Sequence, residues 1–580
     1  LIGIGVVAPY ISLPTSLRNF MVLTALLLVL LPSLSDKSCA GGSEGESFRP
    51  IHYSSIVVSL IGVLVCVAYA RLNFPEFLKV GYDDSFITFR YARNLADFHG
   101  LRFNPSDDSN SASSLTFTIL LAVFDRLTSM DYLTMANILN LGGLFLLVFQ
   151  PIRLMARQTS RVQSLVVQVS LACMIATFPP LVYWTFSGME TTFFLGLLVT
   201  AISTAVDMCR SGTQESPRKS GGLLVVLSVL SLTRVEGALA AGVIGVALAW
   251  NVFSKSGFKA LATRNVIGYL TVPTLSLIAQ LVFYRLYFSS FISDPIHFKT
   301  LVMYYERSAT ESWNSLCSFI LDVGRPIVIV IAFLLLWNLK MWVSGGNPVR
   351  GLTPTLAVFA SLLLFGLRSP FSDEQRYELM LIAPMIVLLA MLVSNLLERF
   401  RASKILSVAA AVLSAGALVG AGLSTQTVQS QIRSRTDLYL YVQKARADAG
   451  KWLESNTPSG SRVVSSDIGA LSFYNKSNVY LDAAGLVNRT QLSAVRGHRD
   501  IYLSMRDQRP EYLVDTVDAS GISGVEQILS NPLSYYVADS GVMTSCKSDK
   551  VFLKEVIKTF PDVAPAGLKV RISKIVGYLC

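Results

Sequence analysis

The stretch from residue 81 to residue 105 reads GYDDSFITFRYARNLADFHGLRFNP and lies between two long apolar runs, 54–72 and 131–150. Its apolar residues recur at the spacing of an α-helix that begins at an acidic pair and ends near Gly100. A helix of this pattern between apolar runs is expected to lie along a membrane surface. The residues that carry the spacing are Ile87, Tyr91, Leu95 and Phe98.

The composition is typical of a membrane protein. Of the 580 residues, 52% are hydrophobic and only 15% are charged, whereas a soluble domain carries about 25% charge. These values exclude a soluble globular enzyme, a disordered chain and a fibre. The formal net charge is +11, which we attribute to cytoplasmic loops rather than to nucleic-acid binding.

Apolar stretches of near-spanning length recur along the chain as far as residue 423. Crossing about 30 Å of hydrocarbon needs roughly 20 helical residues, and most of these stretches approach that length. We therefore predict a polytopic α-helical membrane protein with about eleven transmembrane helices. The predicted spans are 54–72, 131–150, 162–180, 190–208, 221–234, 237–253, 265–287, 323–342, 353–368, 379–396 and 404–423.

Basic residues gather in every second short loop between these spans. Lys and Arg are enriched on the cytoplasmic side of membrane proteins, so the basic loops are predicted to be cytoplasmic. The opposite turns, 178–190, 233–237 and 368–378, are then predicted to lie together on the outward face. The basic residues are Arg153, Arg157, Arg161, Arg210, Arg218, Lys219, Lys255, Lys259, Arg264, Lys340, Arg350, Arg399, Arg401 and Lys404.

This topology divides the chain into three predicted parts. Residues 1–50 are an uncertain segment, which begins with Leu and contains a short apolar run that is either signal-like or an extra helix. Residues 51–423 form a transmembrane domain with outward loops at 73–130 and 288–322. Residues 424–580 are polar, and we predict that they form a soluble α/β domain outside the cell.

Short β-like runs within residues 424–580 favour that prediction, because Gly, Asn and Ser separate them. They include 462–464 and 479–481. Cys546 and Cys580 belong to the same outward segment, where oxidising conditions permit a disulfide bond. The sequence leaves open whether these cysteines pair or stay as thiols.

The acidic pair Asp83–Asp84 has two interpretations. An aspartate at a helix start accepts hydrogen bonds from backbone N–H groups and complements the helix dipole, which is a structural role. A carboxylate at a membrane surface is also suited to take the proton of an acceptor hydroxyl while a lipid-linked group departs. Residue composition alone does not choose between the two.

The loop at 81–105 resembles the first outer loop of C-type glycosyltransferases (GT-C), which are multi-span enzymes that use polyprenyl-phosphate sugars. The similarity runs in order over residues 54–490 and is greatest to the branch that contains the terminal arabinofuranosyltransferase of mycobacterial cell walls. Val235 departs from the family pattern, in which proline is usual. The other matching motifs are Ser187-Gly-Met-Glu-Thr191, Leu232-Thr-Arg-Val-Glu-Gly237, Asp467-Ile-Gly-Ala470 and Leu481-Asp-Ala-Ala-Gly-Leu486.

This resemblance implies a GT-C architecture and the transfer of one sugar from a polyprenyl-phosphate carrier to an extracytoplasmic glycan or protein acceptor. Arabinofuranose is the nearest analogue for the sugar. Family members use an acidic residue of the first outer loop as catalytic base, which points to Asp84 or Asp83. We prefer Asp84, with Asp83 helping to hold acceptor or metal, and a single displacement would invert the anomeric carbon. The chain would act as a multi-pass protein of the plasma membrane.

A departing polyprenyl phosphate needs positive charge at the outer face. For each basic candidate, an ion pair with a nearby carboxylate or a lipid headgroup is the structural alternative. One candidate closes the stretch Asp294-Pro-Ile-His-Phe-Lys299, which loosely resembles an outer loop of the family and contributes His297 as a further candidate. The candidate ligands of the donor phosphate are Arg376, Lys299, Arg234 and Arg90.

Two acidic residues near outward helix ends, Glu190 and Glu236, are costly in a membrane unless they are paired or functional. We expect Arg234 to pair with one of them. The metal stays unassigned, although a divalent cation such as Mg²⁺ or Mn²⁺ would find carboxylate ligands in the acidic pair and Glu190. Trp184 and Tyr183 are expected to belong to the aromatic belt of the membrane interface.

Two other functions stay open. The first is a transporter or flippase of a lipid-linked saccharide, but transporters often contain inverted repeats with matching broken helices, and the sequence shows no such repeat. A non-catalytic scaffold for envelope assembly is the second alternative, and it should tolerate asparagine at both positions of the acidic pair. The expected partners are the lipid-linked donor, the acceptor and the bilayer, without nucleic acid.

Overall fold

The computed structural model describes residues 51–105, 109–112, 114–156, 161–211, 217–302, 317, 336, 352–368, 376–399, 426–517, 523–532, 543–548, 550–560 and 568–580. The N-terminal segment 1–50 and the predicted span 404–423 therefore lie outside the described residues. The predicted span 323–342 also lies outside them, apart from residue 336.

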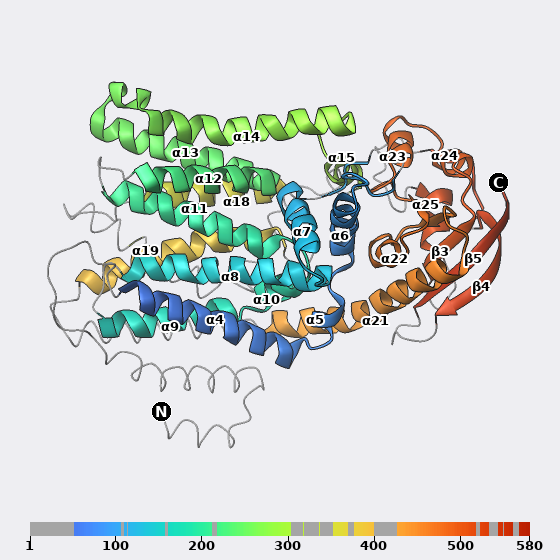
Figure 1. Ribbon diagram of the computed structural model, residues 1–580, viewed down its shortest axis with the longest axis horizontal. Helices are drawn as coiled ribbons and strands as arrows, with labels where there is room; N and C mark the ends of the chain where they lie inside the picture. The colour runs from blue at the N-terminus through green and yellow to red at the C-terminus, as the bar shows by residue number, and fades with distance from the viewer. Residues whose placement is uncertain are drawn as a thin grey trace, which may run out of the picture.

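A helical bundle occupies the first part of the described chain, and Figure 1 shows most of its helices running along the long axis of the molecule. In chain order the helices are α4 (Ile51–Asn73), α5 (Phe77–Val80), α6 (Asp83–Ala96), α7 (Leu115–Leu127), α8 (Tyr132–Ala156), α9 (Arg161–Ala176), α10 (Pro179–Phe186), α11 (Thr191–Ser211), α12 (Pro217–Thr233), α13 (Val235–Ser256), η2 (Phe258–Ala262), α14 (Arg264–Phe288), α15 (Asp294–Val302), α18 (Leu352–Arg368), η3 (Glu378–Leu381) and α19 (Ile382–Arg399).

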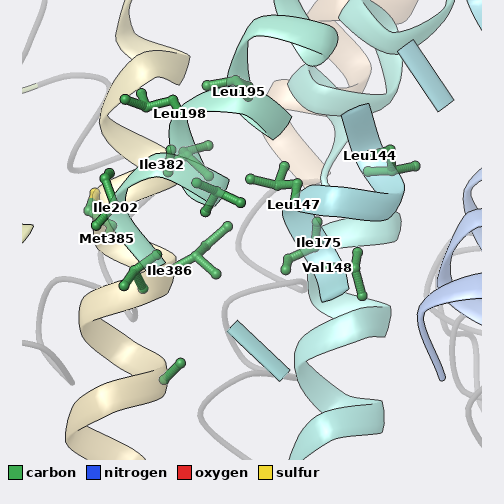
Figure 2. Close-up of a cluster of buried hydrophobic side chains, with 14 of the residues drawn as sticks. Leu144, Leu147, Val148, Ile175, Leu195, Leu198, Ile202, Ile382, Met385 and Ile386 are labelled. Carbon is green, nitrogen blue, oxygen red and sulfur yellow. The ribbon is translucent and has the colours of Figure 1, made fainter. Parts of the chain in front are cut away.

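The centre of the bundle is a close-packed cluster of leucine, isoleucine and valine. Figure 2 shows side chains of α8, α9, α11 and α19 converging, among them Leu147, Leu198 and Ile386, all of which are buried. Lipid tails are as apolar as these side chains, so van der Waals packing between helices, rather than transfer out of water, is the main force that holds such a bundle together.

Six described helices are long and apolar enough to cross a bilayer: α4, α8, α11, α13, α14, and α19 extended by η3. Helices α9 and α10 qualify as one crossing that bends by 61°, and the bend falls where Pro179 and Pro180 cannot continue α9. Helices α12 and α18 are apolar but shorter. The chain is therefore a multi-pass membrane protein, and the predicted total of eleven spans stays a prediction.

The C-terminal region, defined here as the described residues from 426 onward, contains a five-stranded sheet in the order β2-β1-β3-β5-β4. Strands β2, β1 and β3 are parallel to one another, whereas β5 pairs antiparallel with both β3 and β4. The strands predicted at 462–464 and 479–481 are confirmed as β1 and β2. The elements are α21 (Gln426–Asn456), β1 (Arg462–Ser465), α22 (Gly469–Tyr474), β2 (Val479–Asp482), α23 (Arg489–Arg496), α24 (Ile501–Asp507), β3 (Tyr512–Val517), α25 (Gly524–Ser530), β4 (Phe552–Phe560) and β5 (Lys569–Tyr578).

One disulfide bond closes the end of this region. It joins Cys546 to Cys580, whose Cα atoms are 5.2 Å apart. The structure thus answers the question that the sequence leaves open. The bond ties the residue that follows β5 to the segment that precedes β4, so the two antiparallel strands are linked covalently as well as by their hydrogen bonds.

Helices α6 and α7 lie between the bundle and the C-terminal region, across the direction of the bundle helices (Figure 1). The predicted helix after residue 83 is confirmed as α6, but its predicted setting is wrong. Ile87 and Tyr91 pack with Val463 and Tyr480 of the C-terminal region, so the protein itself covers the helix. All α6 residues except Asp84 and Leu95 are buried, and α6 is therefore an interior helix rather than one that lies on a membrane surface.

Helix α21 joins the two parts of the molecule. This helix contacts α5 and α10 of the bundle as well as α22, β5 and β4 of the C-terminal region. Figure 1 shows it extending from below the bundle to the sheet. As a result, the start of α6, the turn between α10 and α11, and the loop after β1 meet in one place. This meeting point contains the acidic pair predicted as the site.

Candidate active site

The start of α6 separates the two members of the acidic pair. Asp83 is the first residue of the helix and is buried, whereas the next residue, Asp84, is exposed. Tyr82 precedes them in an extended conformation, and its backbone N–H donates to the carbonyl oxygen of Ser187 at 2.8 Å. Two adjacent acids of the same chemistry therefore face different surroundings.

Asp83 is bound by the C-terminal region. Its Oδ1 accepts a hydrogen bond from the N–H of Ala470 at 2.9 Å, and its Oδ2 accepts one from the N–H of Gly469 at 3.3 Å. The Nη1 atom of Arg446, on α21, lies 3.7 Å from Oδ2. These contacts give Asp83 a structural partner set, whereas Asp84 is exposed.

The turn between α10 and α11 fits against the first turn of α6. Gly188 has φ +82°, a conformation that favours glycine, and a Cβ atom there would lie 2.8 Å from Ser85 Oγ. The side chain of Asn140 holds this turn from α8, because it donates to the carbonyl of Met189 and accepts from the N–H of Phe193. The motif that the sequence places on the outward face is thus a docking turn for α6.

A buried cluster of two arginines and two glutamates, which we call the arginine centre, lies at the same end of the bundle. Glu190 Oε1 is 2.7 Å from Arg234 Nη1 and 2.9 Å from Arg376 Nη2. Arg234 also contacts both oxygens of Glu236, at 3.1 and 3.3 Å. The expected pairing of Arg234 with these acids is confirmed. One described residue from each of the three turns predicted to share one face therefore meets the others here, namely Glu190, Arg234 and Arg376.

Burial and the neighbouring charges shift the pKa of Glu190, in the turn before α11, in opposite directions. Burial raises the pKa of its carboxyl group, but the guanidinium groups of Arg376 and Arg234 outweigh burial and hold that pKa below its ordinary value. Arg376 keeps one donor unused, since its Nε is buried with no hydrogen-bond partner among the described residues. The centre thus combines a fixed carboxylate with a guanidinium that has capacity for another acceptor.

Two aromatic rings connect the arginine centre to the start of α6. The ring of Tyr82 lies 5.3 Å from that of Trp184, and the guanidinium carbon of Arg376 lies 5.4 Å from the centroid of the Trp184 ring. Trp184 and Tyr183 are buried within the protein, so their predicted place in an aromatic belt at the membrane interface is wrong. The Trp184 ring instead lies between the ring of Tyr82 and the guanidinium of Arg376.

Arg90 is engaged in a different way from the other basic candidates. Its guanidinium donates to the carbonyl oxygens of Phe103, Asn475 and Asn478, at 2.8, 3.0 and 3.2 Å, and also to that of Ser472. It is almost fully buried, and burial lowers its pKa to about 10. The structure therefore places Arg90 in the contact between α6 and the C-terminal region, away from the arginine centre.

The candidates of α15 are placed beside the C-terminal region. Asp294 exchanges backbone and side-chain hydrogen bonds with Asn110, at 2.9 and 2.7 Å, and α15 packs against α23. His297 is half-buried, and burial together with Arg496 lowers its pKa. The side chain of Lys299 lies outside the described residues. None of the described contacts brings α15 to the arginine centre.

The described residues contain no cluster of three or more His, Cys, Asp or Glu side chains placed to hold a metal ion. The carboxylates proposed from the sequence are also divided between two settings, because Asp83 is bound to the C-terminal region and Glu190 to two arginines. The residues that the structure describes therefore do not fit the predicted divalent cation.

Two residues of the site were not selected from the sequence. Arg446 lies in a long polar helix without any local motif. Asp467 belongs to a motif that carries the family resemblance. The signal for Asp467 was that motif, whereas Arg446 had none, because one of its partners, Asp83, lies hundreds of residues away and the other lies in the loop after β1.

Comparisons with known proteins bear on the fold. The family described as Domain of unknown function (DUF8728) matches residues 430–554, and no curated protein matches the chain. Among solved structures, the chain is similar to the Archaeoglobus fulgidus oligosaccharyltransferase tethered with an acceptor peptide, at 11% identity and a TM-score of 0.50, over 80% of this chain and 69% of that one. It is also similar to ArnT from Cupriavidus metallidurans bound to undecaprenyl phosphate, at 11% identity and a TM-score of 0.49, over 90% of this chain and 98% of that one.

At this level of identity, the first of these similarities shows the fold alone. Over the matched part, the chain shares the fold of that oligosaccharyltransferase, which agrees with the architecture expected from the first outer loop. The comparisons do not separate the branches of that fold, so the similarity to the mycobacterial arabinofuranosyltransferase branch stays a prediction.

Proposed function

We propose that the chain is a glycosyltransferase that moves one sugar from a polyprenyl-phosphate carrier to an extracytoplasmic glycan or protein acceptor. The observation that carries this proposal is the exposure of Asp84 on an otherwise buried helix. The buried arginine centre is linked to the start of that helix through Trp184 and Tyr82. The GT-C fold and the motifs of the first outer loop support it, as does the acceptor peptide of the similar oligosaccharyltransferase. Arabinofuranose is the sugar that the branch resemblance favours.

In the proposed reaction, the Asp84 carboxylate takes the proton of an acceptor hydroxyl. The acceptor oxygen forms a bond to the anomeric carbon, while the bond from that carbon to the phosphate oxygen breaks. The electron pair of the broken bond stays on the polyprenyl phosphate, which leaves as an anion. Attack and departure occur on opposite faces of one carbon, so a single displacement inverts its configuration.

We assign the donor phosphate to Arg376, with Arg234 behind it. The Nε donor of Arg376 has no acceptor within the described part of the chain, and guanidinium groups bind phosphate through paired hydrogen bonds. Glu190 and Glu236 cancel much of the positive charge of the centre. This balance suits a site that must release its anionic product, because a fully uncompensated pair of buried arginines would retain it.

Arg90, Lys299 and His297 are the other candidates that the sequence offers. Arg90 is withdrawn from the phosphate site, because carbonyl oxygens of Phe103 and the C-terminal region accept its hydrogen bonds. Lys299 and His297 stay as candidates on α15, which contacts the C-terminal region. We place the site and the C-terminal region on the extracytoplasmic side of the plasma membrane, as the distribution of basic loops favours.

The test is transfer from a panel of radiolabelled polyprenyl-phosphate sugars by membranes that contain the wild-type chain or Asp84→Asn. Asp97→Asn is the matched control, because Asp97 is an exposed aspartate at the other end of α6. We expect transfer from one donor, a loss of about 100-fold to 10,000-fold in Asp84→Asn, and unchanged transfer in Asp97→Asn.

Absence of transfer from every donor by the wild-type chain would contradict the proposed reaction and favour transport or a scaffold. Full activity of Asp84→Asn would contradict its role as base. In each membrane preparation, the amount of folded protein is measured by size-exclusion chromatography in detergent, so that lost activity is not confused with lost protein.

A further inference from the structure

The start of α6 packs directly against the backbone of the loop after β1. Asp83 and Gly469 are both buried, and a Cβ atom at Gly469 would overlap with the carbonyl oxygen of Asp83. The two backbone N–H groups of Gly469 and Ala470 therefore approach the carboxylate directly. Only glycine permits this approach.

Arg446 makes this contact part of a longer connection. Its Nη2 lies 2.8 Å from Asp467 Oδ1, while its Nη1 faces Asp83 Oδ2 at 3.7 Å. Thr516, in β3, donates from its hydroxyl to Asp467 Oδ2 at 2.7 Å. The guanidinium is thus held between two carboxylates, and a residue of the central sheet fixes the second carboxylate.

This connection lies at the carboxyl end of β1, in the middle of the parallel strands. Asp467 follows β1, and the chain places β2 on one side of β1 and β3 on the other. Ligands of open α/β sheets bind at the carboxyl ends of parallel strands, at the point where the strand order reverses. Here the carboxylate at that position belongs to the chain itself and comes from the first residue of α6.

Two further side chains attach the same helix to the same region. Arg90 and Arg93 lie seven and ten residues after Asp83, and Arg93 donates to the carbonyl oxygen of Phe473 at 2.7 Å. With Arg90 bound to Asn475 and Asn478, one side of α6 is held by α22 and the segment that follows it. The position of the helix is therefore set by the C-terminal region as well as by the bundle.

We propose that Asp83, Arg446 and Asp467 are positioning residues through which the C-terminal region fixes the catalytic base Asp84 against the donor. This inference rests on the proposed function. Asp84 follows Asp83 directly in the chain, so any displacement of the bound Asp83 moves the base as well. A displacement of about 1 Å at a reacting group costs on the order of 100-fold in rate. The arginine centre shares no described contact with Arg446 or Asp467, so donor binding does not depend on this connection.

The experiment measures kcat and the KM for the donor, using the full chain and the donor that the wild type accepts. The variants are Asp83→Asn and Arg446→Met, with Lys444→Met as matched control, because Lys444 is an exposed cation on the same helix. We expect kcat to fall about tenfold to 100-fold in both variants, and in each by less than in Asp84→Asn, while the donor KM changes less than about twofold. Lys444→Met should retain wild-type values.

Two additional variants separate positioning from general damage to the fold. Arg446→Lys restores the charge and should recover part of kcat. Asp467→Asn leaves Asp83 and Arg446 intact but loosens the guanidinium, so a smaller fall in kcat is expected even if Arg446→Met does not fold. In the double variant Asp83→Asn/Arg446→Met, the fall should be no larger than that of the more damaging single change, because both act through one connection.

Wild-type kcat in Asp83→Asn, Arg446→Met and Asp467→Asn would overturn this inference and leave the proposed function standing. A loss in Asp83→Asn as complete as that in Asp84→Asn would also overturn it, because Asp83 would then be the catalytic group. Absence of transfer by the wild type, in contrast, would contradict the proposed function itself.

Discussion

Two regions of the molecule bury carboxyl groups in opposite electrostatic surroundings. In the arginine centre, Glu190 lies between Arg234 and Arg376, and its pKa is held below the ordinary value. In the C-terminal sheet, burial and the neighbouring carboxylate of Asp467 raise the pKa of Asp515 to about 8. The two acids are similarly buried, so the difference comes from the charges beside them.

The comparison shows how each region is stabilised. The arginine centre keeps charges ionised inside the protein by balancing them, which suits the binding and release of an anionic group. The sheet region relies on hydrogen bonds: Asp515 accepts one from the hydroxyl of Ser523 and one from the N–H of Val525. Asp83, the first residue of α6, is bound by the loop that follows β1 of this sheet.

The largest effect on stability is expected when Glu190 is changed to glutamine. Two buried guanidinium groups would then lose the carboxylate they share, which costs about 3–5 kcal/mol for a broken buried pair. The measurement is the unfolding temperature of the protein in detergent. Glu236→Gln serves as comparison and should cost less, because Arg234 keeps Glu190 as partner. An equal cost for both variants would contradict the shared role of Glu190.

In contrast to Glu190→Gln, the substitution Asp515→Asn is expected to increase the stability of the protein. The folded state holds a proton on Asp515 up to about pH 8, whereas the unfolded chain releases it near pH 4, so wild-type stability falls as the pH rises through that window. Asparagine does not titrate. The variant should therefore unfold several degrees higher than the wild type at pH 8, and this gain should disappear toward pH 4. A pH-independent difference would contradict the raised pKa.

A smaller loss is expected for Gly188→Ala, which tests how the bundle side holds α6. The left-handed φ of +82° and the contact with Ser85 together cost about 1–3 kcal/mol. The control is Gly142→Ala, in a helical position where a Cβ atom meets nothing within 4 Å. Unfolding in detergent should show a lower temperature for the first variant only. Equal temperatures would mean that the turn adapts and does not fix α6.

The smallest effect is expected at the exposed ion pair of Lys79 with Glu76. Its nitrogen and oxygen atoms are 3.0 Å apart, as close as those of the buried pairs, but both side chains are largely open to solvent. Lys79→Met should therefore change stability by less than about 0.5 kcal/mol. A loss comparable to that of Glu190→Gln would show that burial does not control the strength of these pairs.

Part of this arrangement could be predicted from the sequence, where the signal was local. Helical spacing located α6, alternation of apolar residues with turn formers located β1 and β2, and the distribution of basic loops predicted that three turns meet. The pairing of Arg234 followed from the cost of a charge near a membrane span. The helix and the strands followed from patterns within a few tens of residues, whereas the prediction about the turns used basic residues spread from 153 to 404.

The roles of single residues were not predictable in this way. Asp83 and Asp84 are the same residue type at adjacent positions, and only the C-terminal region, almost 400 residues later, distinguishes them. The same applies to Arg90, whose partners are carbonyl oxygens without any sequence signature. A resemblance in the first outer loop identified the acidic pair but did not show which member is held and which is exposed.

The central claim is that Asp84 acts in the chemistry, whereas the arginine centre binds the donor. It is tested most directly by measuring donor binding and single-turnover transfer for Asp84→Asn and Arg376→Met, with the donor that the wild type accepts. We predict that Asp84→Asn binds donor as the wild type does but transfers at least about 100-fold more slowly. Arg376→Met should bind donor more weakly. Normal transfer by Asp84→Asn, or equal donor binding by Arg376→Met and the wild type, would contradict this division of roles.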